Sequence, residues 1–300
     1  MNNFLLSLTK IQNHINLILK KYLNIFSKKN MNLTLAMKYA LLNGGKRLRA
    51  FLVYCIGKML NVSSNNLDCI AASIECIHAY SLIHDDLPSM DNDRFRRGRE
   101  SCHVKFNEYI AILAGDSLQS LAFNILSTVN MPDVSVNNRM KMISILSYAS
   151  GAKGMCLGQS LDLENQGSLI SIKQLEEIYK YKTSFLIYAA TRMTILSSNI
   201  KNKKILINLI KYSKSIGLAF QIQDDILNVI GSKKITGKCQ GSDKKLNKNT
   251  YSSLIGIKLS KEKAFNLYKK SLSYLEYINE LGYNTESLIK LAHYIIIRNK

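Results

Sequence analysis

The sequence has two prolines in 300 residues, no tryptophan, and few stretches in which apolar and polar residues alternate. Alternation with a period of two is typical of half-buried strands, so its scarcity argues against a sheet protein. Proline ends or kinks helices, so a chain with so little of it can form long ones. Apolar residues instead recur at helical spacing, as in Leu175, Ile178 and Tyr179. The sequence therefore predicts an all-α protein.

A linker rich in proline, glycine or serine is also lacking, and no shift in composition divides the chain. Because 47% of the residues are hydrophobic, the chain can bury a large core. We therefore expect one domain, residues 1–300, folded as a large helix bundle.

The six cysteines form no CxxC pair and no metal-binding spacing. This pattern predicts reduced thiols, mostly in the core, of a cytoplasmic protein. The segment 1–6 lacks the charged region and cleavage site of a secretory signal. The most apolar long segment, 109–129, is interrupted by Asp116 and Gln119, so we expect no membrane span.

Acidic residues number 21 against 41 lysines and arginines, which gives a net charge of +20. Such a balance raises nucleic acid or an anionic membrane as a partner. The lysines are scattered along the chain, however, and no basic stripe with interleaved aromatics occurs. We therefore expect no nucleic-acid partner, although a basic surface still attracts anionic substrates.

Two tight acidic clusters occur, at 85–91 (DDLPSMD) and at 224–228 (DDILN). Carboxylates placed this close repel one another unless a cation lies between them. Taken singly, each cluster could be a solvated turn or a helix cap. Both clusters, however, follow apolar segments with helical spacing, at 79–83 and 216–220, so we expect each to lie at a buried helix. Together they predict a divalent metal site.

Helix geometry sharpens this interpretation. Asp224 and Asn228 are four residues apart and share a helix face with Gln221. Asp85 and Asp91 are six apart, about 240° around an ideal helix, with Pro88 between them. We therefore expect a helix that ends near residue 86 and a loop that returns Asp91 beside Asp85. Mg²⁺ prefers a few carboxylates together with phosphate oxygens, so two such walls imply a phosphorylated substrate.

Cationic residues lie near the same segments, at 44–49 (GGKRLR), 94–99 (RFRRGR), 182–183 (KT) and 237–238 (GK). Arginine grips phosphate oxygens in pairs and lysine supplies a compact charge, so a basic rim beside acidic walls suits a Mg²⁺–diphosphate complex. Considered alone, Lys46 or Lys182 could equally belong to a solvated face.

These motifs, with those at 78–86 (HAYSLIHDD), 114–116 (AGD), 158–159 (GQ) and 221–225 (QIQDD), occur in the order typical of the trans-prenyltransferases, or polyprenyl diphosphate synthases. The chain resembles this family from about residue 40 to its end, and within it the bacterial farnesyl-forming group. The resemblance implies the isoprenoid synthase type of helix bundle with a central apolar cavity, a homodimer, and more than one Mg²⁺ per site.

The resemblance also implies roles for individual residues. The expected contacts to isopentenyl diphosphate are Lys46, Arg49, His78 and Arg97. The expected contacts to the allylic diphosphate, which is dimethylallyl and then geranyl diphosphate, are Arg96, Lys182, Thr183, Gln221 and Lys238. The expected metal ligands are Asp85, Asp91, Asp224 and, less clearly, Asp225. We expect catalysis to depend on Asp85, Asp91, Lys182, Thr183, Gln221 and Asp224.

Two positions depart from the family pattern. The second motif usually ends in aspartate, and Asn228 stands there, which removes a negative charge and should weaken metal binding. Asn247 stands where the family usually has glycine. Asparagine tolerates a left-handed backbone better than most residues, so we expect the turn to survive.

The expected reaction is condensation of isopentenyl diphosphate with dimethylallyl and geranyl diphosphate to give farnesyl diphosphate. Tyr80 lies five residues before Asp85, about 7.5 Å deeper along the helix, where its ring would stop a C15 chain, while Ser81 is too small to stop it earlier. Tyr80 as an ordinary core aromatic is the alternative. Other open functions are a geranyl or geranylgeranyl diphosphate synthase and a non-catalytic partner subunit. A terpene cyclase would not need Lys46, Arg49 and Arg97.

Overall fold

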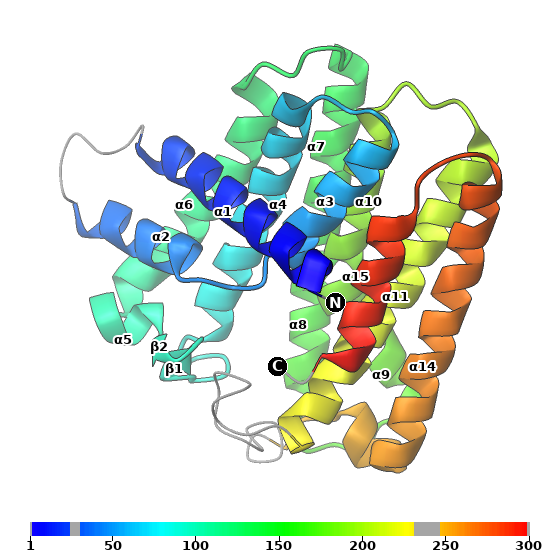
Figure 1. The fold of residues 1–300 in the computed structure, drawn as a ribbon. Helices are drawn as coiled ribbons and strands as arrows, with labels where there is room; N and C mark the ends of the chain where they lie inside the picture. Colours follow the sequence, from blue (N-terminus) through cyan, green and yellow to red (C-terminus); the bar gives the residue numbers. More distant parts are fainter. Residues whose placement is uncertain (1, 25–30, 231–246, 299–300) are drawn as a thin grey trace.

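The computed structural model describes residues 2–24, 31–230 and 247–298. Most of these residues lie in helices, as predicted, and the longer helices stand side by side in a bundle, with α1 and α2 crossing one side obliquely (Figure 1). The helices are α1 Asn2–Asn24, α2 Asn32–Leu42, α3 Leu48–Met59, α4 Ser64–Asp85, α5 Cys102–Phe106, α6 Glu108–Thr128, α7 Val136–Ser150, α8 Met155–Glu164, α9 Ile172–Tyr179, the π-helix η1 Lys180–Ser184, α10 Phe185–Leu196, α11 Lys203–Ile230, α14 Tyr251–Glu280 and α15 Glu286–Ile297.

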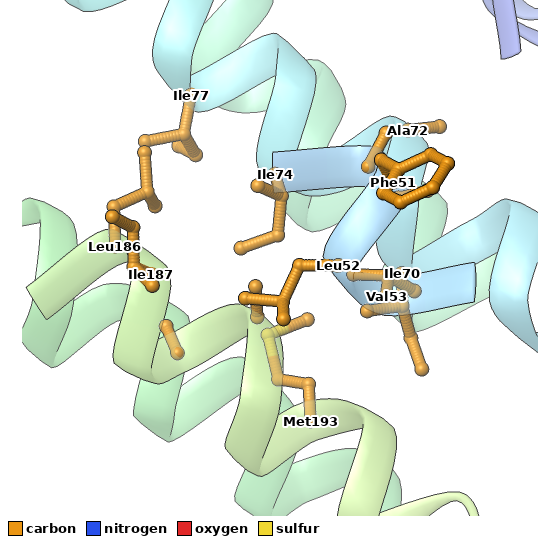
Figure 2. Close-up of a cluster of buried hydrophobic side chains, with 14 of the residues drawn as sticks. Phe51, Leu52, Val53, Ile70, Ala72, Ile74, Ile77, Leu186, Ile187 and Met193 are labelled. Carbon is orange, nitrogen blue, oxygen red and sulfur yellow. The ribbon is translucent and has the colours of Figure 1, made fainter. Parts of the chain in front are cut away.

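Helix α4 runs through the core of the bundle, packed between α3, α6 and α10. Apolar side chains lie on every side of it, and Ile70, Ile74 and Ile77 are fully buried. A helix that is apolar all round must be enclosed by others. Figure 2 shows Ile74 and Ile77 facing residues of α3 and α10. This packing fixes α4, and with it the acidic cluster at its C-terminal end.

A two-stranded hairpin, β1 Phe95–Arg96 and β2 Arg99–Glu100, lies at one end of the bundle (Figure 1). Arg96 pairs with Arg99, so Arg97 and Gly98 form the turn, with φ angles of 55° and 76°. A two-residue hairpin turn with both φ angles positive favours glycine, and here one position is an arginine. The sequence pattern did not predict these strands.

Helix α6 is, in the described part of the chain, the helix long and apolar enough to cross a membrane by length and composition. Half of its most apolar stretch is buried, and it packs along α4. That placement is typical of a helix in a bundle. The five cysteines in described segments are free thiols, and four of them are buried, whereas Cys239 lies outside the described residues.

Candidate functional site

A cavity of about 610 Å³ is lined by the C-terminal part of α4, by η1 and by the C-terminal part of α11, together with Arg96 and Arg97 of the hairpin. An adjoining cavity of about 320 Å³ extends it past Met155 and Leu186. The residues predicted from sequence that line these two cavities are Lys46, Arg49, His78, Ser81, Asp85, Asp91, Arg96, Arg97, Lys182, Thr183, Gln221, Asp224 and Asp225. Lys238 lies outside the described residues. The structure thus brings together segments that span the chain from residue 46 to residue 225.

The first acidic wall has the geometry that Pro88 predicted. Helix α4 ends at Asp85, and the amide of Asp91 donates to the carbonyl of Asp85 at 2.9 Å. The loop between them therefore closes on itself and returns Asp91 to the cavity. Burial raises the pKa of the Asp85 carboxyl, Lys182 opposes that shift, and Asp91 adds to it.

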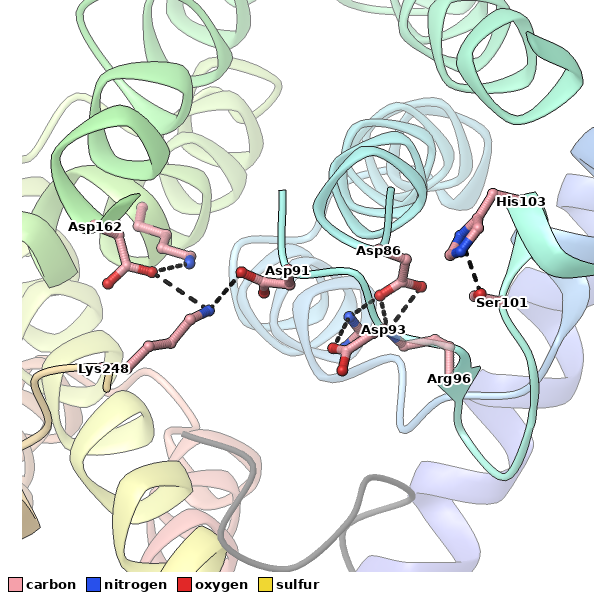
Figure 3. A network of polar contacts seen from close by, with 9 residues as sticks. Asp86, Asp91, Asp93, Arg96, Ser101, His103, Asp162 and Lys248 are labelled. Carbon is pink, nitrogen blue, oxygen red and sulfur yellow. Dashed lines mark hydrogen bonds and ion pairs between the residues drawn. The ribbon is translucent and has the colours of Figure 1, made fainter. Parts of the chain in front are cut away.

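Lys248, from a distant segment of the chain, reaches this wall beside Asp162 (Figure 3). Nζ of Lys248 lies 2.7 Å from Oδ1 of Asp91 and 3.7 Å from Oδ2 of Asp162. Nζ of Lys182 donates to the same Asp162 oxygen at 2.5 Å. Burial alone would lower the pKa of Lys182. The carboxylates of Asp162, Asp85 and Asp91 outweigh burial and raise this pKa, so the ammonium group stays charged. Carboxylates and ammonium groups thus neutralise one another within the cavity.

Asp162 and Lys248 were not singled out from the sequence. A signal for Asp162 existed, because it lies one turn after Gly158 and Gln159 on α8. Gly158 is needed there, since an added Cβ would come within 2.2 Å of the backbone nitrogen of Lys182. Lys248 gave no such signal, because it follows other lysines in a polar segment.

Arg96 and Asp86 form a pair beside the first wall (Figure 3). Nε of Arg96 donates to both oxygens of Asp86, at 2.9 and 3.1 Å, and Nη2 lies 3.4 Å from Asp93. Asp86 is 2% exposed, and the guanidinium of Arg96 neutralises its buried carboxylate. The pair fixes the hairpin against the end of α4 and leaves Arg96 at the edge of the cavity.

The second acidic wall divides its two aspartates. Asp224 has a side chain 43% exposed and forms an ion pair with Arg298, whose guanidinium lies 4.2 Å over the Phe220 ring. Asp225 is 3% exposed, and its Oδ2 accepts from the Tyr179 hydroxyl at 2.5 Å and from the Tyr251 amide at 2.8 Å. Protein donors thus engage Asp225, whereas Asp224 is more exposed, and the role of Asp225 as a metal ligand stays a prediction.

A hydrogen-bonded chain links the second wall to η1. The Thr183 hydroxyl donates to Oε1 of Gln221 at 2.8 Å, and the Gln221 amide lies 3.4 Å from Oδ1 of Asp225. The π-helix η1 inserts an extra residue into an otherwise α-helical segment, so that Lys182 and Thr183 both reach the cavities. Both amide atoms of the buried Gln159 lack a protein partner.

The segment 44–49 forms the cationic side of the cavity. Nη1 of Arg97 donates to the Gly44 carbonyl at 2.8 Å and to Asn43 at 3.3 Å. Gly45 has φ 104°, and an added Cβ would lie 2.7 Å from Cζ of Arg97. Nη1 of Arg49 lies 3.4 Å from Nε2 of His78. A side chain at residue 45 would therefore displace Arg97.

Burial changes the acidity of these groups. Burial and the nearby Arg298 charge lower the pKa of Lys46 to about 8, and Asp224 opposes that shift. Burial and Arg47 lower the pKa of Arg97 to about 10. Burial and the surrounding guanidinium groups lower the pKa of His78 well below its usual value, so its imidazole is neutral. Like charges thus lie close together on this side of the cavity.

Tyr80 is 5% exposed, and its hydroxyl lies 3.4 Å from Sγ of Cys156 on α8. Its ring meets that of His84 edge to face, with centroids 5.3 Å apart. Ser81, the next residue, lines the adjoining cavity, whereas Tyr80 is not among the described residues that line either cavity. Its role in product length stays a prediction.

The acidic walls suit a hard divalent cation that is completed by its substrate. Within the described ranges no three Asp, Glu, His or Cys side chains converge closely enough to hold an ion by themselves. Asp91 already forms an ion pair with Lys248, and Asp224 with Arg298, so both carboxylates can bind a cation. Mg²⁺ commonly takes one or two carboxylates and fills its remaining positions with water and phosphate. The residues present fit that requirement.

Comparison with known proteins gives consistent matches. The polyprenyl synthetase family model matches residues 30–281. A farnesyl diphosphate synthase from Escherichia coli is 53% identical over 264 residues, which are 88% of each chain. Its counterpart from Haemophilus influenzae is 46% identical over 299 residues, 99% of each chain. The crystal structure of a geranyltransferase from Legionella pneumophila superimposes with a TM-score of 0.87 at 34% identity, covering 99% of this chain and 98% of the other.

Proposed function

Because the chain belongs to the polyprenyl synthetase family and has its all-α isoprenoid synthase fold, we propose that it is a farnesyl diphosphate synthase. It condenses isopentenyl diphosphate with dimethylallyl and then geranyl diphosphate, and releases diphosphate. The observation that supports this most is that one cavity is lined by two sets of cationic residues and by carboxylates between them. The sets are Lys46, Arg49 and Arg97, and Arg96 and Lys182. Such a cavity can hold two diphosphates at once.

The allylic diphosphate is proposed to lie at the acidic walls. Asp85, Asp91 and Asp224 would hold more than one Mg²⁺ ion. When bound, these ions would draw negative charge from the diphosphate, so that the C–O bond of the allylic substrate ionises. Lys182 binds the diphosphate oxygens, helped by Arg96 and by Lys238, and so stabilises the leaving group. We leave Asp225 out of this set, because Tyr179 and Tyr251 donate hydrogen bonds to its carboxylate.

Isopentenyl diphosphate is proposed to lie on the other side, against Lys46, Arg49 and Arg97, with neutral His78 as a hydrogen-bond partner. Its double bond attacks the allylic cation, and the released diphosphate takes the proton that is lost. A side-chain base is not needed. Thr183, Gln221 and Gln159 line the adjoining cavity, where the dipoles of their hydroxyl and amide groups would stabilise the cation.

The exposed apolar residues of α6 support a homodimer, the assembly expected from the family resemblance. Tyr109, Ile112 and Leu113 are 62%, 43% and 47% exposed and lie within one turn of one another. An apolar face on a core helix is typical of a contact with a second copy. The cysteine pattern supports a cytoplasmic location.

Product analysis tests the proposed function. Purified protein with Mg²⁺ and radiolabelled isopentenyl diphosphate is given dimethylallyl or geranyl diphosphate, and the chains are separated after removal of the phosphates. We expect a C15 product from both primers. A C10 or C20 end product would make it a geranyl or geranylgeranyl diphosphate synthase, and no condensation with either primer would overturn the proposal.

A further inference from the structure

A buried ion pair, Arg47 with Glu75, lies in the wall of the cavity beside the proposed isopentenyl diphosphate site. Nη1 of Arg47 donates to Oε2 of Glu75 at 2.8 Å, and both side chains are 2% exposed. Arg47 stands between Lys46 and Arg49 in the chain, yet it takes no part in the proposed chemistry. A charge pair this deeply buried is costly to desolvate, so its presence calls for a purpose other than stability.

Arg47 is fixed by three helices. Besides Glu75 of α4, its guanidinium donates from Nε and Nη2 to Oδ1 of Asn16 on α1, at 3.2 and 3.0 Å, and from Nη2 to the Leu41 carbonyl of α2. Its backbone is left-handed, with φ 51° and ψ 34°. A non-glycine residue keeps that conformation only where surrounding contacts hold it.

Glu75 also caps helix α3 from outside. Arg47 is the N-cap residue of α3, and its own side chain makes no capping bond. Oε1 of Glu75 instead accepts from the amide of Ala50 at 3.3 Å, in the first turn. One carboxylate therefore fixes both the side chain of Arg47 and the start of the helix on which Arg49 lies.

The neighbouring residues depend on this arrangement. Gln12 of α1 donates to the Lys46 carbonyl at 3.0 Å, so the backbone before Arg47 is held as well. With Arg47 turned into the core, Lys46 and Arg49 line the cavity. Glu75 and His78 lie one turn apart on α4. The helix that carries His78 therefore also holds Arg47, between Lys46 and Arg49, through Glu75.

On this basis, and resting on the proposed function, we propose that Arg47 and Glu75 are positioning residues. They orient Lys46 and Arg49 for the diphosphate of isopentenyl diphosphate and tie that site to α4, the helix that ends in Asp85. Their charged groups are engaged with protein atoms, so in this proposal they act through Lys46 and Arg49 rather than on a substrate. Their loss should weaken use of isopentenyl diphosphate more than use of the allylic substrate.

The chain offers a matched control on the same helices. Asp68 of α4 accepts from the Tyr54 hydroxyl of α3 at 2.5 Å and lies 2.7 Å from Nε2 of His14 on α1. Asp68 precedes Glu75 by seven residues, which is about 10.5 Å along the helix and away from the cavity. Asp68→Asn thus disturbs the contacts of α1, α3 and α4 without reaching the site.

Steady-state kinetics with each substrate varied would test the proposal, with thermal unfolding recorded in parallel. For Glu75→Gln we expect KM for isopentenyl diphosphate to rise about tenfold or more, because small displacements of binding groups are costly, while KM for geranyl diphosphate changes less than about twofold. Asn16→Ala, which leaves no charge unpaired, should raise the same constant by a smaller factor. Asp68→Asn should leave KM for both substrates within about twofold of the wild type, even if it lowers the melting temperature as much as Glu75→Gln does.

The double variant Arg47→Met with Glu75→Met separates positioning from stability. Apolar replacement of a buried pair often restores stability, so its melting temperature should approach that of the wild type. Its KM for isopentenyl diphosphate should stay high. Recovery of both would overturn the proposal, as would equal effects of Glu75→Gln and Asp68→Asn. Active wild type with unchanged Glu75→Gln kinetics refutes this inference alone, whereas inactive wild type refutes the proposed function.

Discussion

The lowered pKa of Lys46 leads to a pH dependence that can be measured for one substrate at a time. The free enzyme holds Lys46 protonated below about pH 8 and neutral above it. A diphosphate carries its charge throughout this range, since the second pKa of a phosphate is about 6. Loss of the ammonium charge should therefore weaken binding of isopentenyl diphosphate as pH rises.

The size of the effect follows from the pKa. At pH 9 about one molecule in eleven keeps Lys46 charged, so kcat/KM for isopentenyl diphosphate should be about tenfold below its value at pH 7. A charge-assisted contact contributes about 1.5–3 kcal/mol, so the decline should level off about 10–100-fold down. Arg97, with a pKa of about 10, and Lys182, whose pKa is raised, stay charged over this window.

The assay measures kcat/KM between pH 7 and 9.5 for each substrate with the other saturating. For isopentenyl diphosphate we expect a break near pH 8, and for geranyl diphosphate no break. Lys46→Arg keeps its charge throughout, so this variant should lack the break. A flat wild-type profile to pH 9.5, or the same break in Lys46→Arg, would refute the reasoning.

Three further predictions concern the acidic walls and product length. Asp85→Ala and Asp224→Ala should each lower kcat by several orders of magnitude with unchanged circular dichroism, because each removes charge that must hold the cation; more than a tenth of wild-type turnover at saturating Mg²⁺ would show that assignment to be wrong. Asn228→Asp restores a charge to the second wall, so the Mg²⁺ concentration for half-maximal rate should fall, and an unchanged titration would place residue 228 away from the ion. Tyr80→Ala should yield products of C20 or longer by chromatography; an active variant that stops at C15 would assign chain length to another residue.

Local features of the first acidic cluster could be predicted from the sequence alone. Pro88 and the six-residue spacing require a helix end and a returning loop, and the structure has both. Asn247 likewise adopts the left-handed backbone that its amide tolerates, with φ 48°. These predictions succeeded because a few neighbouring residues determine the conformation.

Contacts between distant segments could not be predicted in the same way. Lys248 meets Asp91 across 157 positions, and no local pattern distinguishes it from other lysines. Asp224 and Asp225 are chemically equal neighbours about 100° apart on α11, and only Tyr179 and Tyr251 decide which one is enclosed. In the segment 46–49, likewise, three cations occur together, and tertiary contacts turn Arg47 inward.

The irregularity at η1 has a consequence for how this gene can change. The π-helix at Lys180–Ser184 holds one residue more than an α-helix of the same length would need. Deletion of one of these five residues would let α9 and α10 join in a regular helix and keep their faces toward the bundle, but it would replace the wide turn that carries Lys182 and Thr183 by a narrower one. Lys182 and Thr183 could then no longer serve the same cavity. A single-codon deletion here would therefore abolish activity and still leave a well-formed helix.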